Sequence, residues 1–380
     1  MWRIYTWLRL LLLGLAGTWG LCLPGVSRAA EMTLEELIEA VRQNELLYER
    51  IEFTWRCKYT TFNRHLLPPS TPTDKFIHEE DERLHVVYQP PYLLREEEMK
   101  QSYGEGEWKD VPFWVAFDGE KTRMLHDRLG NISKGFVRAG LHITPHNMLV
   151  HHWADMPLSL YLSGREAAER AGWNVGFNSS VKTSYQGVEE WGGLRCHRVR
   201  VLHYFPGKGE SGATDLWLAD ERNYIPVRVV GYSYWISRKE PGGCAEVTEW
   251  HEVEPGIWFP WRASIQAYYV GDLRPPGKDN RQHRRDIAVE SVRLQPEYDA
   301  SYFRFEFPPK TYVYELEQGE IKKSYQTGSP ADPNLRPDES ARRRLVFWIG
   351  LATVGGIVGL IVAFWFWRKR RVNAAAVRAM

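Results

Sequence analysis

The chain has 380 residues, of which 43% are hydrophobic and 26% charged, and this composition excludes an intrinsically disordered protein. Three of its 49 Lys and Arg residues fall in residues 1–29 and eight in 342–380, where no Asp or Glu occurs. The middle therefore carries 38 basic residues against all 48 acidic ones. An acidic body excludes nucleic acid as an expected partner, because that binding depends on neutralising phosphates with Lys and Arg.

Residues 1–29 have the layout of a secretory signal peptide. Arg3 and Arg9 precede an apolar run over residues 10–23, and Pro24-Gly25 breaks that run shortly before Ala29. We expect cleavage after Ala29, and the alternative is an uncleaved N-terminal anchor. The segment indicates that the body of the chain is exported from the cytoplasm.

The exported body, residues 30–316, has the pattern of one α+β domain. Thr33 and Glu36 form a T-x-x-E capping box, and apolar residues follow at helical spacing, which predicts an amphipathic helix to about Arg50. Many short runs rich in Val, Ile, Tyr, Trp and Phe come next, separated by turn residues, as is typical of an antiparallel sheet. The clearest hairpin turn is Asp118-Gly119, since this pair readily adopts the positive φ angles that a tight turn requires.

Further hairpins are expected around Gly192-Gly193 and within residues 214–235 and 246–269, with a last long strand over 286–294. Residues 147–172 interrupt this pattern, because helix formers surround Pro157, and they predict two short helices inserted between strands. Residues 317–344 are assigned to a linker, since 324–340 are rich in Pro, Ser and Asp without apolar periodicity.

Residues 345–367 form an uninterrupted apolar segment, long enough to cross a bilayer core of about 30 Å as a helix. Trp348, Trp365 and Trp367 lie near its ends, where aromatic rings favour the headgroup level. We expect a single transmembrane helix, with the domain outside and a short basic cytoplasmic tail over residues 368–380. Gly355 and Gly359 form a G-x-x-x-G, which would let two such helices approach closely as a homodimer; the alternative is that Gly is simply common in membrane helices.

Three cysteines remain after signal cleavage, Cys57, Cys196 and Cys244, and they allow at most one internal disulfide. We favour a Cys196–Cys244 bond, because both residues fall in consecutive strand-rich segments. None of the three has a CxxC partner, so the sequence predicts neither redox catalysis nor a cysteine zinc site.

A cluster of histidines is the best candidate for a metal site: His142, His146, His151 and His152. Since no carboxylate pattern such as H-E-x-x-H accompanies them and Pro145 interrupts the region, a solvated loop or helix face is the favoured interpretation. The carboxylate runs 79–81 and 189–190 are interpreted as solvated charge. No nucleophile elbow, phosphate-binding loop or kinase motif occurs, so we predict no catalytic residues, no metal and no cofactor.

Tryptophan is abundant, with 17 residues, many next to other aromatic side chains, as in Phe113-Trp114 and Tyr234-Trp235. In a curved sheet we expect these rings to fill the concave core side. The alternative is that some line an apolar cavity for a lipid or an acyl chain, because ligand sites are mostly apolar and aromatic.

Three stretches resemble one known superfamily. Residues 291–315 resemble its closing signature, 114–121 its "w-DG-k" hairpin and 215–230 its "lw-d-ern-P-r" strand pair. The residues that carry the closing signature are Pro296, Glu297, Tyr298, Asp299, Phe303, Phe305, Phe307, Pro308 and Val313. On these motifs the chain is similar to the outer-membrane lipoprotein-carrier and sigma-factor-regulator superfamily (LolA/LolB/RseB-like), over most of residues 33–315.

This resemblance implies a half-open antiparallel β-barrel with helices plugging its concave side, and a hydrophobic cavity that takes acyl chains or senses lipoproteins. The expected partner is a lipid or an acylated protein held by a membrane-tethered, extracytoplasmic binding protein. The membrane helix separates the chain from soluble carriers, because a tethered carrier could not shuttle freely. Two alternatives stay open: an interaction module with a filled core, and a membrane-anchored hydrolase that uses the His-rich segment. The sequence does not identify ligand-binding residues.

Overall fold

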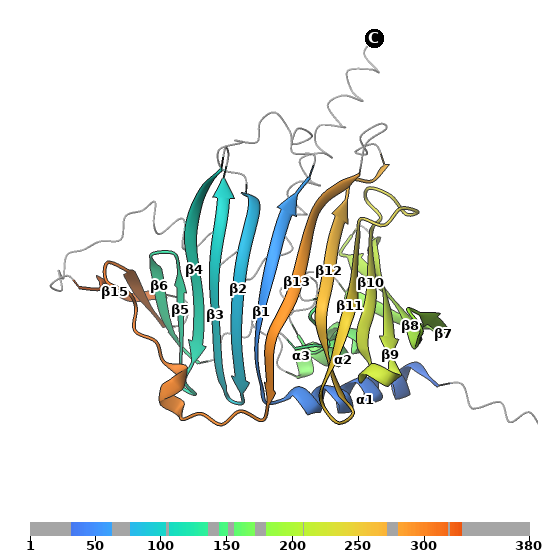
Figure 1. The fold of residues 1–380 in the computed structure, drawn as a ribbon, viewed down its shortest axis with the longest axis horizontal. Coiled ribbons are helices and arrows are strands. Elements are labelled where there is room, and N and C mark those ends of the chain that lie inside the picture. The colour runs from blue at the N-terminus through green and yellow to red at the C-terminus, as the bar shows by residue number, and fades with distance from the viewer. Residues whose placement is uncertain are drawn as a thin grey trace, which may run out of the picture. The chain divides into compact units, whose positions relative to one another are not determined.

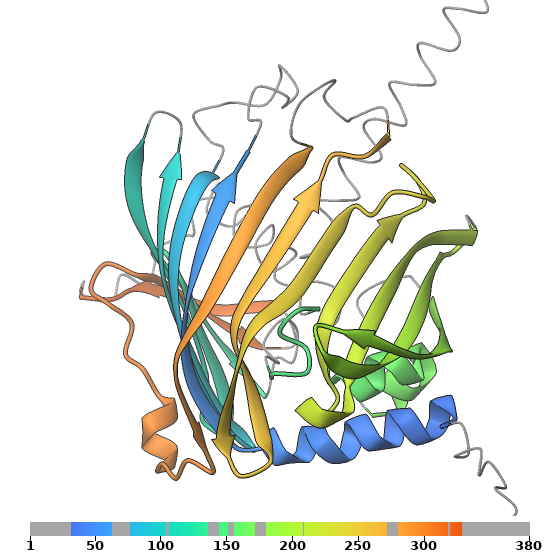
Figure 2. The same ribbon diagram turned by 45° about the vertical axis from the view of Figure 1, so that its right-hand side comes forward.

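The computed structural model describes residues 32–62, 77–103, 106–135, 144–150, 156–171, 180–207, 209–271, 280–317 and 320–328. Fifteen strands in this part of the chain form one sheet, in the order β15-β14-β6-β5-β4-β3-β2-β1-β13-β12-β11-β10-β9-β8-β7 (Figure 1). Neighbouring strands pair antiparallel except for β14 and β6, which run parallel. The sheet curves strongly, and β15 and β7 are its two ends (Figure 2). A curved, unclosed sheet with few helices agrees with the predicted half-open barrel.

The strands are β1 Ile51–Thr61, β2 Ile77–Gln89, β3 Tyr92–Tyr103, β4 Glu107–Phe117, β5 Lys121–His126, β6 Leu129–Lys134, β7 Ser180–Trp191, β8 Leu194–Phe205, β9 Gly209–Ala219, β10 Ile225–Ser233, β11 Gly243–Glu254, β12 Ile257–Tyr268, β13 Arg281–Leu294, β14 Tyr312–Glu317 and β15 Glu320–Gln326. The α-helices are α1 Leu34–Glu45, α2 Leu158–Ser163 and α3 Arg165–Arg170. Short 3-10 helices are η1 Leu46–Tyr48, η4 Asp220–Arg222 and η6 Ala300–Phe303.

The local sequence signals explain most of these elements. The predicted opening helix is α1, whose Leu37 and Val41 are fully buried. At the β4–β5 turn Gly119 has a φ of 92°, and the Asp118 carboxylate accepts hydrogen bonds from the backbone N–H groups of Glu120 and Lys121. The two short helices predicted within residues 147–172 are α2 and α3, and α2 begins directly after Pro157.

The short helices η1 and α2 pack against one face of the sheet, which we call the inner face. The Tyr161 hydroxyl of α2 lies 3.3 Å from Nε2 of His203 on β8. The Tyr48 hydroxyl donates a hydrogen bond to the backbone oxygen of Trp258 at 2.5 Å. Residues 144–150 are all buried on the same side, where Met148 and Val150 have no exposed surface. We call the opposite face the outer face.

A segment without regular strands, residues 295–311, crosses the lower ends of β1–β4 on the outer face, and we call it the strap (Figure 1). Its Phe303 is fully buried in a small cluster with Val87, Leu94 and Ala116. Farther along, Phe307 lies directly over Gly130, where an added Cβ would be only 2.6 Å from its ring. The strap thus builds a second, smaller core outside the sheet.

The sheet extends beyond the predicted domain boundary at residue 316, since β15 pairs with β14 over residues assigned to the linker. The predicted signal peptide, the membrane segment 345–367, the tail 368–380 and the pair Gly355 and Gly359 lie outside the described residues. None of the helices in the described part is long and apolar enough to cross a membrane.

Candidate functional site

The inner face carries a continuous row of side chains that runs across nine strands. Residues directly opposite each other on paired strands point to the same face, so the row can be followed from the strand register. From β8 to β3 it consists of Val199, Leu216, Val229, Ala245, Ile265, Arg285, Tyr59, Glu80 and Gln101. We call it the inner row, and its character changes from apolar to polar between β12 and β13.

The apolar half of the inner row, on β8–β12, is well packed. Its five side chains are at most 8% exposed. Phe259 of β12 extends it and lies next to Phe53 of β1, with ring centroids 5.8 Å apart and both side chains almost completely buried. Each Val, Leu, Ile or Phe side chain among them contributes about 1.5–3 kcal/mol by leaving water, so this half supplies much of the core.

The polar half, on β13 and β1–β3, buries charge instead. Glu80, Glu82 and Glu97 are 6–9% exposed and lie on the inner face of β2 and β3. Gln101 donates a hydrogen bond to Glu80 at 2.8 Å, and the Trp55 indole N–H donates to Glu82 at 3.2 Å. The interpretation of residues 79–81 as solvated charge is therefore wrong for Glu80. Alternation along β2 turns Glu80 inward, whereas its neighbours Glu79 and Asp81 are exposed.

Two arginines neutralise part of this charge. Arg95 forms an ion pair with Glu97, and both side chains are largely buried. The second cation is Arg285, whose charge favours the ionised form of Glu82. Burial and the nearby charge of Glu97 act in the opposite direction and raise the pKa of Glu82 to about 7. The polar half therefore holds three carboxyl groups and two guanidinium groups, and Glu82 is poised to carry a proton near neutral pH.

The candidate metal site is not assembled in the described residues. His146 has no exposed surface; its Nε2 lies 2.8 Å from the backbone oxygen of Asn223 and its ring contacts Tyr48 edge-on. The favoured interpretation as a solvated face is thus wrong for His146, which is a core residue. His142, His151 and His152 lie outside the described residues. No group of three or more His, Cys, Asp and Glu side chains in the described ranges could hold a metal ion.

The expected Cys196–Cys244 disulfide is wrong, because Cys57, Cys196 and Cys244 are all free thiols. The strands β9 and β10 lie between β8 and β11, so the two cysteines are about 14 Å apart across the sheet alone. A disulfide requires Cα atoms within about 7 Å. Burial raises the pKa of each of the three thiols, which makes them poor nucleophiles.

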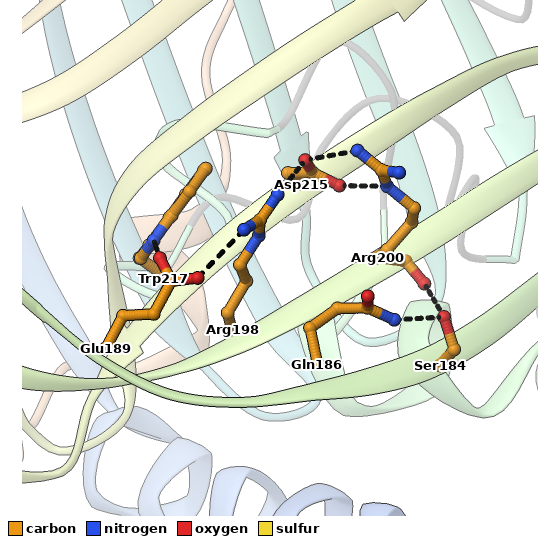
Figure 3. Close-up of polar contacts among 7 residues, drawn as sticks. All are labelled: Ser184, Gln186, Glu189, Arg198, Arg200, Asp215 and Trp217. Carbon is orange, nitrogen blue, oxygen red and sulfur yellow. Dashed lines mark hydrogen bonds and ion pairs between the residues drawn. The ribbon is translucent and has the colours of Figure 1, made fainter.

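The outer face of β7–β9 carries a separate charged network, shown in Figure 3. Asp215 has no exposed surface and accepts hydrogen bonds from Arg198 at 3.0 Å and from Arg200 at 2.6 and 2.7 Å. Glu189 of β7 accepts from Arg198 at 2.8 Å and from the Trp217 indole at 2.9 Å. The network cross-links three adjacent strands, so a structural role accounts for it.

Aromatic rings complete this outer network. The Arg228 guanidinium lies 3.7 Å from the Trp191 ring centroid and 4.9 Å from that of Trp217, and Arg198 lies 5.1 Å from Trp217. Strand alternation places these rings on the outer face. The expectation that the tryptophans fill the concave side holds for Trp55 but not for Trp191 and Trp217. On the outer face Trp217 is buried in an apolar cluster with Cys196, Ala219, Val227 and Val230, and Trp191 packs against that cluster.

No family model matches the sequence, and no curated protein matches it. Similar solved structures include a DUF1329 family protein from Desulfovibrio piger, with 9% identity, and a putative outer membrane lipoprotein-sorting protein domain from Vibrio parahaemolyticus, with 8% identity. Each of these two matches covers 71% of this chain and 97% of the other chain, with a TM-score of 0.37. Another is the Mycobacterium tuberculosis lipoprotein LppX, with 12% identity, coverage of 70% and 98%, and a TM-score of 0.23. The description of the Vibrio parahaemolyticus domain names lipoprotein sorting, the class of protein that the sequence motifs resemble.

Proposed function

We propose that the protein is an extracytoplasmic binding protein for an apolar ligand or a lipidated partner, tethered to a membrane by residues 345–367. The observation that carries the proposal is the inner row. A curved, unclosed sheet presents an apolar half and a polar half side by side on its concave face. This buried arrangement matches an amphiphile, with its chain among the side chains of β8–β12 and its polar group near Glu82 and Arg285, better than it matches a pure hydrocarbon.

The tether and the compartment rest on the sequence. The signal-peptide layout of residues 1–29 directs the chain out of the cytoplasm, and the segment 345–367 would hold it at the membrane. We propose a binding role without a catalytic step, since the buried carboxyl groups and thiols described above are engaged in packing and ion pairing.

Native mass spectrometry of residues 30–340, purified from a bacterial periplasm without detergent, tests this function. A retained mass that matches a fatty acid, a phospholipid or an acylated protein would support it and identify the class of ligand. Protein that carries no ligand and takes up no added lipid would contradict it.

The packing of the apolar half favours one second candidate, a protein-interaction module that acts through its surface. Leu37 and Val41 of α1 and Leu158 of α2 are fully buried, so these helices already fill part of the concave side. In that case the membrane helices could associate through Gly355 and Gly359. Replacing both by Leu would then weaken self-association in membranes, and unchanged self-association would count against this candidate.

A further inference from the structure

An imidazole ring on the outer face lies between two carboxylates. His85 of β2 has its Nδ1 3.2 Å from Glu96 of β3 and its Nε2 3.3 Å from Glu52 of β1. An ionised carboxylate can only accept hydrogen bonds, and a neutral imidazole carries only one N–H. Both contacts are therefore satisfied together only when His85 carries two protons and a positive charge.

Glu52 connects this histidine to the strap. Its two oxygens both lie 3.0 Å from the Tyr298 hydroxyl, and Arg293 of β13 approaches one of them at 3.1 Å. The backbone of Tyr298 is fixed as well, since its N–H donates to the Gln89 side chain at 3.0 Å and its oxygen accepts from the same amide at 3.1 Å. We call the group of His85, Glu52, Glu96, Arg293 and Tyr298 the clamp.

Other charged or titratable groups around the clamp do not replace the imidazole. Tyr302 stacks on Tyr298 with ring centroids 4.0 Å apart and covers its outer side. Arg83 and Glu290, the next pair along β2 and β13, are 3.3 Å apart, and Glu290 is also paired with Arg56. Among the described residues His85 is thus the group that joins both carboxylates of the clamp.

We infer that the clamp is a pH-sensitive fastening of the strap: doubly protonated His85 holds Glu52 in place for Tyr298, and loss of that proton loosens residues 297–303. When His85 loses one proton, one of its two hydrogen bonds to Glu96 and Glu52 is lost. The lone pair of the deprotonated ring nitrogen then faces a carboxylate. Loosening would uncover the apolar cluster of Phe303, Val87, Leu94 and Ala116 on the outer face. The inference goes beyond the proposed ligand function and does not depend on it.

The direction of the pH effect follows from the same contacts. Hydrogen bonding to Glu96 and to Glu52 outweighs burial and raises the pKa of His85 above its ordinary value. Because the folded protein holds this proton more tightly than the unfolded chain, the clamp is at full strength below about pH 6.5 and weakens as the pH rises through the raised pKa.

Hydrogen–deuterium exchange of the full chain in detergent, measured by mass spectrometry as protection factors from pH 5.5 to 8.5, tests the clamp. Protection of residues 297–303 should fall roughly tenfold across this range, the effect of losing one charged hydrogen bond. His85→Arg should keep high protection at every pH, since a guanidinium group bridges two carboxylates without titrating. His85→Gln should show low protection throughout.

The matched control is His251→Gln, because His251 is 44% exposed and contacts the single carboxylate of Glu249 at 2.9 Å. This variant should behave like the unmodified chain. Protection that does not change with pH in the unmodified chain, or that still falls with pH in His85→Arg, would overturn the inference. If His85→Gln does not fold, the comparison of His85→Arg with the unmodified chain still tests whether the proton on His85 controls the protection of residues 297–303.

Discussion

The two halves of the inner row differ in the kind of side chain that they bury. On β8–β12 five apolar side chains are buried, whereas on β13 and β1–β3 the same row holds carboxyl and guanidinium groups. Burying ions costs several kcal/mol each unless they are paired, so the polar half adds little to stability. The comparison teaches that the apolar half builds the fold, while the polar half contributes little to its stability.

Removing a ring from the apolar half should have the largest effect. Phe259→Ala would leave a cavity beside Phe53, so we expect the free energy of unfolding to fall by about 4 kcal/mol, measured by urea denaturation. Trp108→Ala, at a 48% exposed side chain, is the control and should change stability by less than about 0.5 kcal/mol. A loss below about 1 kcal/mol for Phe259→Ala would remove the distinction between the halves.

Breaking an ion pair in the polar half should come next. Arg95→Met would leave Glu97 buried without its cation and lower the free energy of unfolding by about 3 kcal/mol. The double variant Arg95→Met with Glu97→Leu should recover most of that loss, because no unpaired charge remains. If the double variant is as unstable as the single one, packing rather than charge explains the effect.

The pH dependence of stability should reveal Glu82. Its pKa of about 7 lies above the value of about 4.3 in an unfolded chain, so the folded protein holds a proton that the unfolded chain releases. The free energy of unfolding should therefore fall, by on the order of 2 kcal/mol, as the pH rises from about 4.3 to 7.

Glu82→Gln should lessen this decline in a series of denaturant curves at different pH values. The remainder includes Glu45, whose pKa burial also raises to about 7 and which the variant leaves in place. Glu79→Gln, at an exposed position on the same strand, should keep the whole decline. Identical pH profiles for the two variants would contradict a buried, protonated Glu82.

The smallest effects are expected on the outer face. Asp215→Ala removes the shared acceptor of Arg198 and Arg200, but both arginines are about one-third exposed and can reach water, so a loss of about 1–2 kcal/mol is expected. Glu189→Gln, at a 42% exposed side chain, should cost less than about 1 kcal/mol. A loss above about 3 kcal/mol for Asp215→Ala would show that this network, and not the inner face, dominates the β7–β9 region.

The sequence predicted those features that depend on neighbours along the chain. The opening helix and the turns at Asp118-Gly119 and Gly192-Gly193 follow from local spacing. So do the two short helices within residues 147–172, although both lie after Pro157 rather than on either side of it. The sequence could not predict features that depend on register between distant strands. Glu80 and Glu79 are adjacent in an acidic run, and only the pairing of β2 with β1 and β3 turns Glu80 inward beside Gln101.

The same limit applies to the site and to the clamp. His85 and Glu52 are 33 residues apart, and neither carries a motif, so no local signal marked them. One signal was available in retrospect: on β2, Glu80 and Glu82 share the side of Leu84 and Val86, the buried side of the strand. Acidic residues at the inward positions of a strand indicate a buried polar site.

The central claim is that the apolar half of the inner face binds the chain of an amphiphile. The most direct measurement uses the full-length protein and a fatty acid with a photoactivatable diazirine at the end of its chain, followed by mapping of the labelled peptides. We predict labelling within β8–β12 and α1, reduced by an excess of unlabelled fatty acid. Labelling confined to the outer face or to residues 345–367, or labelling that no competitor reduces, would contradict the account.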